Sequence, residues 1–382
     1  MQIVRVLKNK NADGLRGIAC LSVVLHHFIA AFLPFLLHKD YPTVFAAQEQ
    51  SSLFVEFFSS PVMTLFYSGH FAVVIFFVLS GYVLAAPYYT RDDASLVLQK
   101  RLWGRYLRLN IPVAASIALS LLLYSCRKYY NLPASALSGS QWLAHYFPPC
   151  LSYVTGIQDM LWKSLVLGDA TFNTTLWTLK TEFIGSVCLL LFYILKPKKK
   201  TLLPWIFFLL LLYFCYQKNF IFLFAIMMGS LLNAVTIPKR CFPLLVLGGL
   251  YLGAFQFENQ LYDFLPIVGP WKKKDFYATI GAILLVAPIV QGYGRKLFES
   301  RLFQFLGTIS FSLYLLHFLV LCSFSCALYL FLHHTFLALL FNFFLYLLIA
   351  VFFAILFERY IDKPAIALAH RVANFLLNLK SK

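Results

Sequence analysis

The stretch from Asp13 to His27 reads D-G-L-R-G-I-A-C-L-S-V-V-L-H-H and opens a long apolar run near the start of the chain. We expect it to begin a first membrane helix whose cytoplasmic end carries the charged residues. Arg16 and His27 are eleven residues apart, which on a helix is about 16 Å, or about half of a ~30 Å hydrocarbon core. Eleven residues also make about three turns plus ~20°, so both side chains should lie on nearly the same face. Ionisable groups at membrane depth usually face a bundle interior or a water-filled cavity, so this pair indicates a polar shaft entering from the cytoplasmic side.

The composition of the 382 residues indicates a polytopic membrane protein, because 61% are hydrophobic, 12% are charged and the mean hydropathy is +0.76. A soluble protein could not bury this much apolar surface. The net charge of +17 could suggest nucleic acid, but most basic residues lie in short segments between apolar runs, as the positive-inside rule expects. The eight cysteines show no C-x-x-C pair and no metal-ligand spacing. We therefore expect no metal site and no nucleic-acid partner.

The predicted fold is all-α, a single integral-membrane domain over residues 1–382 with about ten transmembrane helices. The predicted spans are 15–37, 65–88, 109–125, 174–195, 201–217, 219–237, 242–257, 276–291, 305–330 and 335–357. Lys and Arg concentrate in alternate connecting segments, on the side of the N-terminus, which predicts that both termini are cytoplasmic. The run Lys272-Lys273-Lys274 lies on the opposite side, and we interpret it as a solvated surface. The long outer segments 38–64 and 126–173 are expected to be functional or partly helical along the interface.

Arg105 and Arg108 end the second inner segment, with Arg101 upstream. Residues i and i+3 share a helix face, so the first two should form a two-pronged cation at the membrane boundary. Guanidinium groups match phosphate oxygens bidentately, which suits a nucleotide-type donor such as coenzyme A. Ordinary positive-inside topology with lipid headgroup contact is the open alternative.

Three further polar residues fall within apolar spans. Glu182 lies about 12 Å into the span that begins at residue 174, close to Lys180, so it is either a site residue or half of a buried ion pair. His317 lies about 18 Å deep and could meet His27 near the midplane, with a structural role as the alternative. Ser80 belongs to a small Ser-Gly pair in F-F-V-L-S-G-Y, for which close helix packing is the default explanation.

His27 carries the sharpest chemical prediction. A neutral imidazole can take the proton of a hydroxyl group as that oxygen attacks an acyl carbon. The chain has no G-x-S-x-G elbow and no reactive-cysteine signature, so direct transfer is favoured over a covalent acyl-enzyme. His26 is adjacent but should point ~100° away, which makes it the weaker candidate.

Taken in order, these motifs resemble the membrane-bound acyltransferase-3 family, which O-acylates sugars and related hydroxyl compounds. The segments that carry the resemblance run through nearly the whole chain and occur in the order of the family pattern. They are Asp13–Gly17 with His27, Phe76–Tyr82, Arg105 with Arg108, Leu176–Phe183, Gly307–His317 and Phe357–Pro364. Val74 stands where many bacterial members carry an acidic residue, and Phe311 stands where the pattern has Tyr.

The resemblance implies ten membrane helices, acyl-CoA (commonly acetyl-CoA) as co-substrate with no permanently bound cofactor, and a hydroxyl-bearing acceptor, with a glycan as the favoured class. It assigns the catalytic His and its Arg partner to His27 and Arg16, and donor binding to Arg105 and Arg108. The remaining expected site residues are Asp13 and Glu182 in catalysis, Arg101 and Ser80 in donor binding, and Trp177, His317, Ser310 and Tyr314 in acceptor binding. The expected location is the plasma membrane or a bacterial inner membrane, with lipid as a partner.

Two alternatives stay open. A proton-coupled secondary transporter could use the intramembrane His and Glu as a proton relay, although the chain shows no matched broken helices and no internal repeat. A transporter–acyltransferase hybrid would also move the acyl group across the membrane. Substrate-dependent proton uptake without acyl-CoA would favour the transporter, and product found only on the far side of a sealed vesicle would favour the hybrid.

Overall fold

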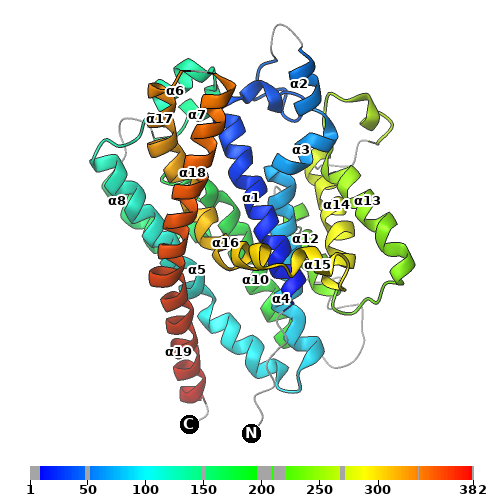
Figure 1. Ribbon diagram of the computed structural model, residues 1–382. Helices are drawn as coiled ribbons and strands as arrows, with labels where there is room; N and C mark the ends of the chain where they lie inside the picture. The colour runs from blue at the N-terminus through cyan, green and yellow to red at the C-terminus, as the bar shows by residue number, and fades with distance from the viewer. Residues whose placement is uncertain are drawn as a thin grey trace.

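The computed structural model describes residues 9–47, 52–147, 152–195, 209, 213, 220–266, 272–333 and 335–380, and this part of the chain is helical and contains no strand. The start of α1 and the end of α19 lie at the same end of the molecule (Figure 1). The first half of the chain forms α1 (Lys10–Phe32), η1 (Pro34–Leu37), α2 (Leu53–Phe58), α3 (Pro61–Tyr67), α4 (Gly69–Thr90), α5 (Ala94–Ser125), α6 (Asn131–Ser138), α7 (Gln141–Ala144), α8 (Tyr153–Gln158), η2 (Asp159–Lys163), α9 (Ser164–Val166), η3 (Thr174–Leu176) and α10 (Trp177–Leu195). The second half forms α12 (Phe220–Leu231), η5 (Lys239–Cys241), α13 (Phe242–Gly253), η6 (Gln260–Tyr262), α14 (Lys273–Val290), α15 (Arg295–Phe298), α16 (Arg301–Val320), η7 (Leu321–Ser325), α17 (Cys326–Phe331), α18 (Phe336–Phe357), η8 (Glu358–Asp362) and α19 (Lys363–Lys380).

Six helices of the described part are long and apolar enough to cross a membrane, which confirms a multi-pass all-α protein. They are Lys10–Phe32, Gly69–Thr90, Ala94–Ser125, Thr174–Leu195, Arg301–Phe331 and Phe336–Leu379. The predicted number of ten is not confirmed. α12 and α13 have 12 residues each, or ~18 Å, which is short for a ~30 Å core. The predicted span 201–217 lies almost wholly outside the described residues.

α1 is the central helix, packed against α4 and α16. Glycine makes its contact with α16 possible, since a Cβ at Gly307 would lie 2.2 Å from the backbone oxygen of Asp13. α4 and α12 approach as closely, because a Cβ at Gly81 would lie 1.7 Å from the backbone oxygen of Ile226. The close packing predicted for the Ser-Gly pair of α4 is therefore observed at Gly81.

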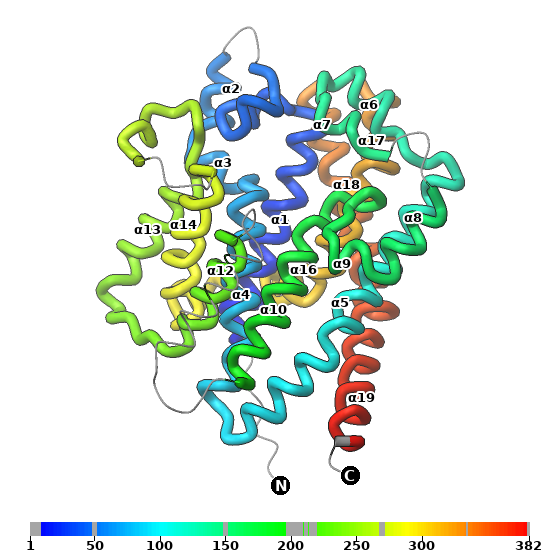
Figure 2. The backbone as a smooth tube through the Cα atoms, turned by 180° about the vertical axis from the view of Figure 1, so that it is seen from behind, coloured from blue at the N-terminus to red at the C-terminus, as the bar shows by residue number. Residues whose placement is uncertain are grey.

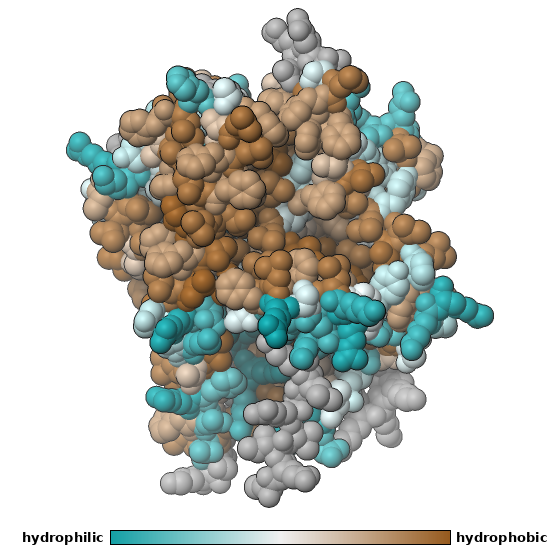
Figure 3. Space-filling view, in the orientation of Figure 1, coloured by the Kyte–Doolittle hydropathy of each residue, from teal (hydrophilic) through white to brown (hydrophobic). Residues whose placement is uncertain are grey.

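The surface divides into an apolar zone and a polar belt (Figure 3). α18 supplies part of the apolar zone, and only 22% of the most apolar window of its span is buried, as expected for a lipid-facing helix. Below the belt, α19 packs against the first half of α5 (Figure 2). The long segment 126–173 is partly helical, as predicted, and forms α6 to α9.

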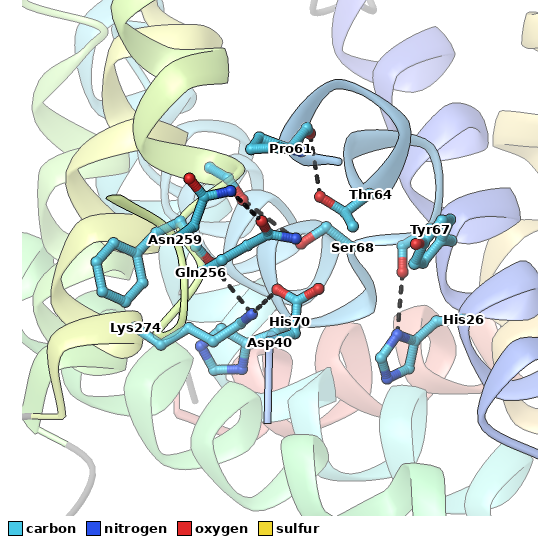
Figure 4. A network of polar contacts seen from close by, with 12 residues as sticks. His26, Asp40, Pro61, Thr64, Tyr67, Ser68, His70, Gln256, Asn259 and Lys274 are labelled. Carbon is cyan, nitrogen blue, oxygen red and sulfur yellow. Dashed lines mark hydrogen bonds and ion pairs between the residues drawn. The ribbon is translucent and has the colours of Figure 1, made fainter. Parts of the chain in front are cut away.

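The expectation of a solvated surface at Lys272-Lys273-Lys274 is wrong at Lys274. This side chain is buried and forms an ion pair with Asp40 (Figure 4). Its ammonium lies 4.3 Å from the ring centroid of Tyr41. A buried lysine is tolerated here because a carboxylate and an aromatic face replace part of the lost hydration. The pair joins α14 to the segment that follows η1.

Candidate active site

Two cavities lie between α1, α4, α10 and α16. The first, which we call the charged cavity, has a volume of about 520 Å³, lies nearer the chain termini and includes Arg16, Arg105 and Glu182 in its lining. The second, which we call the histidine cavity, has a volume of about 260 Å³ and includes His27. Among the described residues, Val73 and Tyr314 are the two that line both cavities. These two side chains therefore lie between the cavities.

A chain of hydrogen bonds determines the tautomer of His27. Nδ1 of His317 lies 2.9 Å from the carbonyl oxygen of Leu313, which can only accept, so this nitrogen carries the proton. The other ring nitrogen of neutral His317, Nε2, then accepts from Nδ1 of His27 at 2.8 Å. In neutral His27 the Nε2 atom is left with a free lone pair. This is the protonation pattern that a general base requires.

Packing holds the His27 ring in place. Trp142 of α7 stacks on it with ring centroids 5.6 Å apart, and Phe318 meets it edge-on at 5.5 Å. His317 is fully buried and is absent from the lining of both cavities. The predicted meeting of His27 and His317 is therefore observed. His317 contacts His27 from behind and lines neither cavity.

In the charged cavity, Glu182 is the centre of a hydrogen-bonded group. It accepts from Ser80 Oγ at 2.5 Å and forms an ion pair with Arg105, whose Nε donates to Ser186 Oγ at 2.7 Å. The possible ion pair with Lys180 is not the one formed. Residues two apart on a helix face different directions, and the Lys180 side chain packs against Gly168 instead.

Arg108 also has a carboxylate partner in the charged cavity. It pairs with Asp362 in the π-helical turn η8, and its guanidinium lies 5.2 Å from the ring centroid of Phe311. Arg105 and Arg108 thus line one cavity, as expected, but each is already engaged by an acidic side chain. Arg16 has a looser partner, with 3.7 Å between its Nη1 and Oδ1 of Asp13. Asp13 lies beside the cavity and is not among its lining residues.

Arg101 is placed away from the other predicted donor-binding residues. It donates to the carbonyl oxygens of Val83 at 2.7 Å and Leu84 at 3.1 Å, and it does not line the charged cavity. Pro87 has no backbone N–H, so the Val83 carbonyl lacks its usual helical partner. Arg101 donates a hydrogen bond to that carbonyl in place of the backbone N–H that Pro87 lacks.

The residues predicted for acceptor binding separate between the cavities. Trp177 lines the histidine cavity, and Ser310 lines the charged cavity. Tyr314 lines both, and its hydroxyl donates to the carbonyl of Thr175 at 3.1 Å and lies 2.9 Å from Oγ1 of Thr178. Ser80 lines the charged cavity, where it was expected.

The comparison with known proteins identifies the family. A family model described as an acyltransferase domain matches residues 9–359, nearly the whole chain. The chain belongs to the acyltransferase-3 family. This acyltransferase is 28% identical over 209 residues to the O-acetyltransferase PaAT-1 of Phomopsis amygdali, an alignment that covers 47% of this chain and 39% of that protein. It therefore aligns with less than half the length of this relative. No solved structure matches the chain.

The structure adds residues that sequence reasoning left unassigned in the acyltransferase. His26, Tyr41, His70 and Trp142 all line the histidine cavity. His26 Nδ1 lies 3.0 Å from the carbonyl of Tyr67, as Figure 4 shows, and His70 lies 3.1 Å from Asp275. His70 lies at the outer end of its predicted span and carried no spacing signal, and Trp142 lies in the long segment 126–173, where no single residue was singled out.

Tyr41 is a neutral hydrogen-bond donor in the lining of the histidine cavity. Burial, followed by the nearby carboxylates of Asp40 and Asp275, raises the pKa of Tyr41 well above its usual value. The phenol therefore stays protonated at physiological pH. A hydroxyl or carbonyl oxygen in the histidine cavity could accept its hydrogen bond.

Proposed function

We propose that this acyltransferase moves an acyl group, with acetyl as the first candidate, from acyl-CoA in the charged cavity to a hydroxyl group held in the histidine cavity. The observation that carries the proposal is the position of His27. His27 lines a cavity that is separated from the charged cavity by the side chains of Val73 and Tyr314, which line both. A base, a hydroxyl acceptor and a thioester could therefore meet there.

In the proposed reaction, His27 Nε2 takes the proton of the acceptor hydroxyl as that oxygen attacks the thioester carbonyl carbon. A carbon–oxygen bond forms and the carbon–sulfur bond breaks. The proton then passes from His27 to the leaving thiolate, which yields the ester and free CoA and returns His27 to its neutral form. His317 accepts from Nδ1 throughout, so it orients the ring and stabilises the transient imidazolium.

Charge supports the charged cavity as the donor site. Its lining mixes cations with acids, namely Arg16, Arg105, Arg108 and Lys363 with Glu182, Glu358 and Asp362. Arg16, with the loosest carboxylate partner, is the guanidinium most available to a phosphate oxygen. In the proposed orientation both termini and this cavity face the cytoplasm, where CoA is available, across a plasma membrane or a bacterial inner membrane.

The histidine cavity suits an uncharged acceptor. Among the described residues, its lining contains histidines and aromatic rings and no Lys, Arg, Asp or Glu. Aromatic faces such as Trp142 and Trp177 can pack against the C–H faces of a sugar ring, while histidine and tyrosine groups bind hydroxyls. A carbohydrate or a related neutral polyol is therefore the proposed acceptor. The O-acetyltransferase named above supports transfer to oxygen.

The test uses purified full-length protein, with acetyl-CoA as donor and a panel of methyl glycosides as acceptors. Binding of acetyl-CoA is measured by calorimetry, and transfer by release of free thiol together with mass-spectrometric detection of the acetylated glycoside. We expect acetyl-CoA binding that Arg105→Ala/Arg108→Ala weakens and His27→Gln retains. If no acyl-CoA binds, and proton uptake accompanies solute entry into liposomes, the protein is a transporter and the proposal fails.

A further inference from the structure

Two side chains lie between the cavities, and we call them the neck. Val73 and Tyr314 are each only 7% exposed, and they are the described residues common to the two linings. His27 lies only in the histidine cavity, whereas Arg16 and Glu182 lie only in the charged cavity. Any group that passes from one cavity to the other must therefore pass these two side chains.

Tyr314 is a firmly held part of this neck. Its hydroxyl is bonded to the Thr175 carbonyl and to Thr178, which ties α16 to the start of α10. Its ring lies 6.0 Å from that of Phe76 and 6.0 Å from that of His317. Val73, on α4, completes the neck with a side chain that has no polar contact and can be resized by substitution.

The position of the neck constrains the donor. For the acceptor hydroxyl to be deprotonated by His27, the thioester carbonyl must reach the Val73–Tyr314 neck, so the acyl chain beyond the carbonyl extends into the histidine cavity. That cavity is partly open, and the volume within its lining, which the acyl chain and the acceptor would share, is about 260 Å³. A methylene group is about the size of a water molecule, whose share of liquid volume is ~30 Å³. Four extra methylenes would therefore take about 120 Å³, nearly half of the available volume.

We propose that Val73 and Tyr314 select the length of the acyl chain, admitting two or three carbons and excluding six or more. This inference rests on the proposed function, since it assumes an acyl-CoA donor in the charged cavity. It goes further by assigning chain-length selection to two residues that bind neither the phosphates of the donor nor the proton of the acceptor. The histidine cavity therefore holds the acceptor and also limits the length of the acyl chain.

Val73 offers a matched control in the next residue. Val74 is also a valine of α4 and is 0% exposed, but it lines neither cavity. Val73→Ala and Val74→Ala delete the same atoms from one helix at adjacent buried positions. A general loosening of α4 would affect both variants, whereas a change in the neck would affect only the first. Val73→Phe provides the opposite change by narrowing the neck.

The experiment titrates CoA, acetyl-CoA, butyryl-CoA and hexanoyl-CoA into the purified full-length protein and compares dissociation constants. In wild type and Val74→Ala we expect hexanoyl-CoA to bind at least tenfold more weakly than acetyl-CoA. In Val73→Ala this ratio should fall to threefold or less. In Val73→Phe, acetyl-CoA should lose at least tenfold more affinity than CoA itself.

Two results would overturn the inference and leave the donor site intact. One is an affinity in wild type that stays constant or rises with chain length, as it would if long chains fold back along Phe76 and Phe77 in the charged cavity. The other is an equal chain-length profile in Val73→Ala and Val74→Ala. Failure of CoA and of every thioester to bind would instead overturn the proposed function, and with it this inference.

Discussion

The charged cavity and the histidine cavity are built largely on the same helices, yet they use polar residues in opposite ways. In the charged cavity nearly every ion has a partner, as in Arg105 with Glu182 and Arg108 with Asp362. In the histidine cavity the polar lining groups are histidine and tyrosine side chains, with His26 held by the backbone carbonyl of Tyr67 and His27 by the side chain of His317 behind it. The difference separates the two tasks of an acyl transfer, which are holding a charged donor and moving a proton.

The largest expected effect comes from removing the base. His27→Gln should lower turnover by about 10²–10⁴-fold, the usual contribution of a positioned general base, while acetyl-CoA binding in the charged cavity changes little. Thiol release under saturating acetyl-CoA measures the first quantity and calorimetry the second. His333→Gln, an exposed histidine outside both cavities, is the control and should match wild type. Loss of binding in His27→Gln would show that the two cavities do not divide the tasks in this way.

A smaller effect is expected from the residue behind His27. His317→Phe removes the acceptor for His27 Nδ1, so the ring can rotate and adopt the unproductive tautomer. We expect kcat to fall by about 10–100-fold, as for other partners that orient a reactive histidine. The KM for acetyl-CoA should stay unchanged, because His317 lines neither cavity. A merely structural role would predict a lower yield of folded protein with normal kcat per folded molecule.

The ion pairs of the charged cavity can be tested with two substitutions of opposite expected sign. Arg108→Ala should weaken acetyl-CoA binding by about tenfold if the guanidinium reaches a phosphate, a charge-assisted contact of about 1.5–3 kcal/mol in other proteins. Asp362→Asn releases Arg108 from its carboxylate and should tighten binding, with a steeper dependence on salt. Calorimetry at two salt concentrations measures both. Weaker binding in Asp362→Asn would mean that Asp362 positions Arg108 and does not compete with the donor for it.

The sequence predicted how deep the site residues lie along their helices better than it predicted which residues of other helices they contact. Helical rise placed His27 and His317 at similar depth from opposite ends of the chain, and the structure brings them to 2.8 Å. Rise and periodicity depend only on residue number, so they can be read from one helix. Glu182 shows what they miss. Its partner Arg105 is on another helix, and no spacing along α10 identifies that helix as a neighbour.

Other contacts depended on features that a single segment does not reveal. Arg101, predicted to bind the donor, donates to a carbonyl that Pro87 frees on a different helix, a contact that its own segment does not reveal. Lys274 was expected in solvent, but it meets Asp40, which lies more than two hundred residues earlier. Trp142 packs on His27 from a segment whose only sequence signal was its length. In each case the deciding partner was fixed by helix packing.

The smallest expected effect lies outside both cavities, at Asp159 in the π-helical turn η2. Its carboxyl is 1% exposed, and neither oxygen has a hydrogen-bond partner within the described part of the chain. Burial, followed by the charge of Asp169, raises the pKa of Asp159 to about 6 from 3.8. Because the folded-state pKa is above the unfolded value, the fold prefers the protonated acid. Its contribution to stability is therefore lost as the pH rises from about 4 through 6.

Asp159→Asn should consequently stabilise the protein at pH 8 by about 1–3 kcal/mol, the usual cost of an unsatisfied buried polar group, and should have little effect at pH 4. Thermal unfolding in detergent at both pH values measures the difference, with Asp263→Asn as an exposed control that should not respond. Transfer activity per folded molecule should stay at the wild-type level, because Asp159 lines neither cavity. If activity instead changed with the pH dependence of unfolding, the segment 152–166 would be coupled to the catalytic site. The functional site would then have to include the segment 152–166, which packs against α5, in addition to the two cavities.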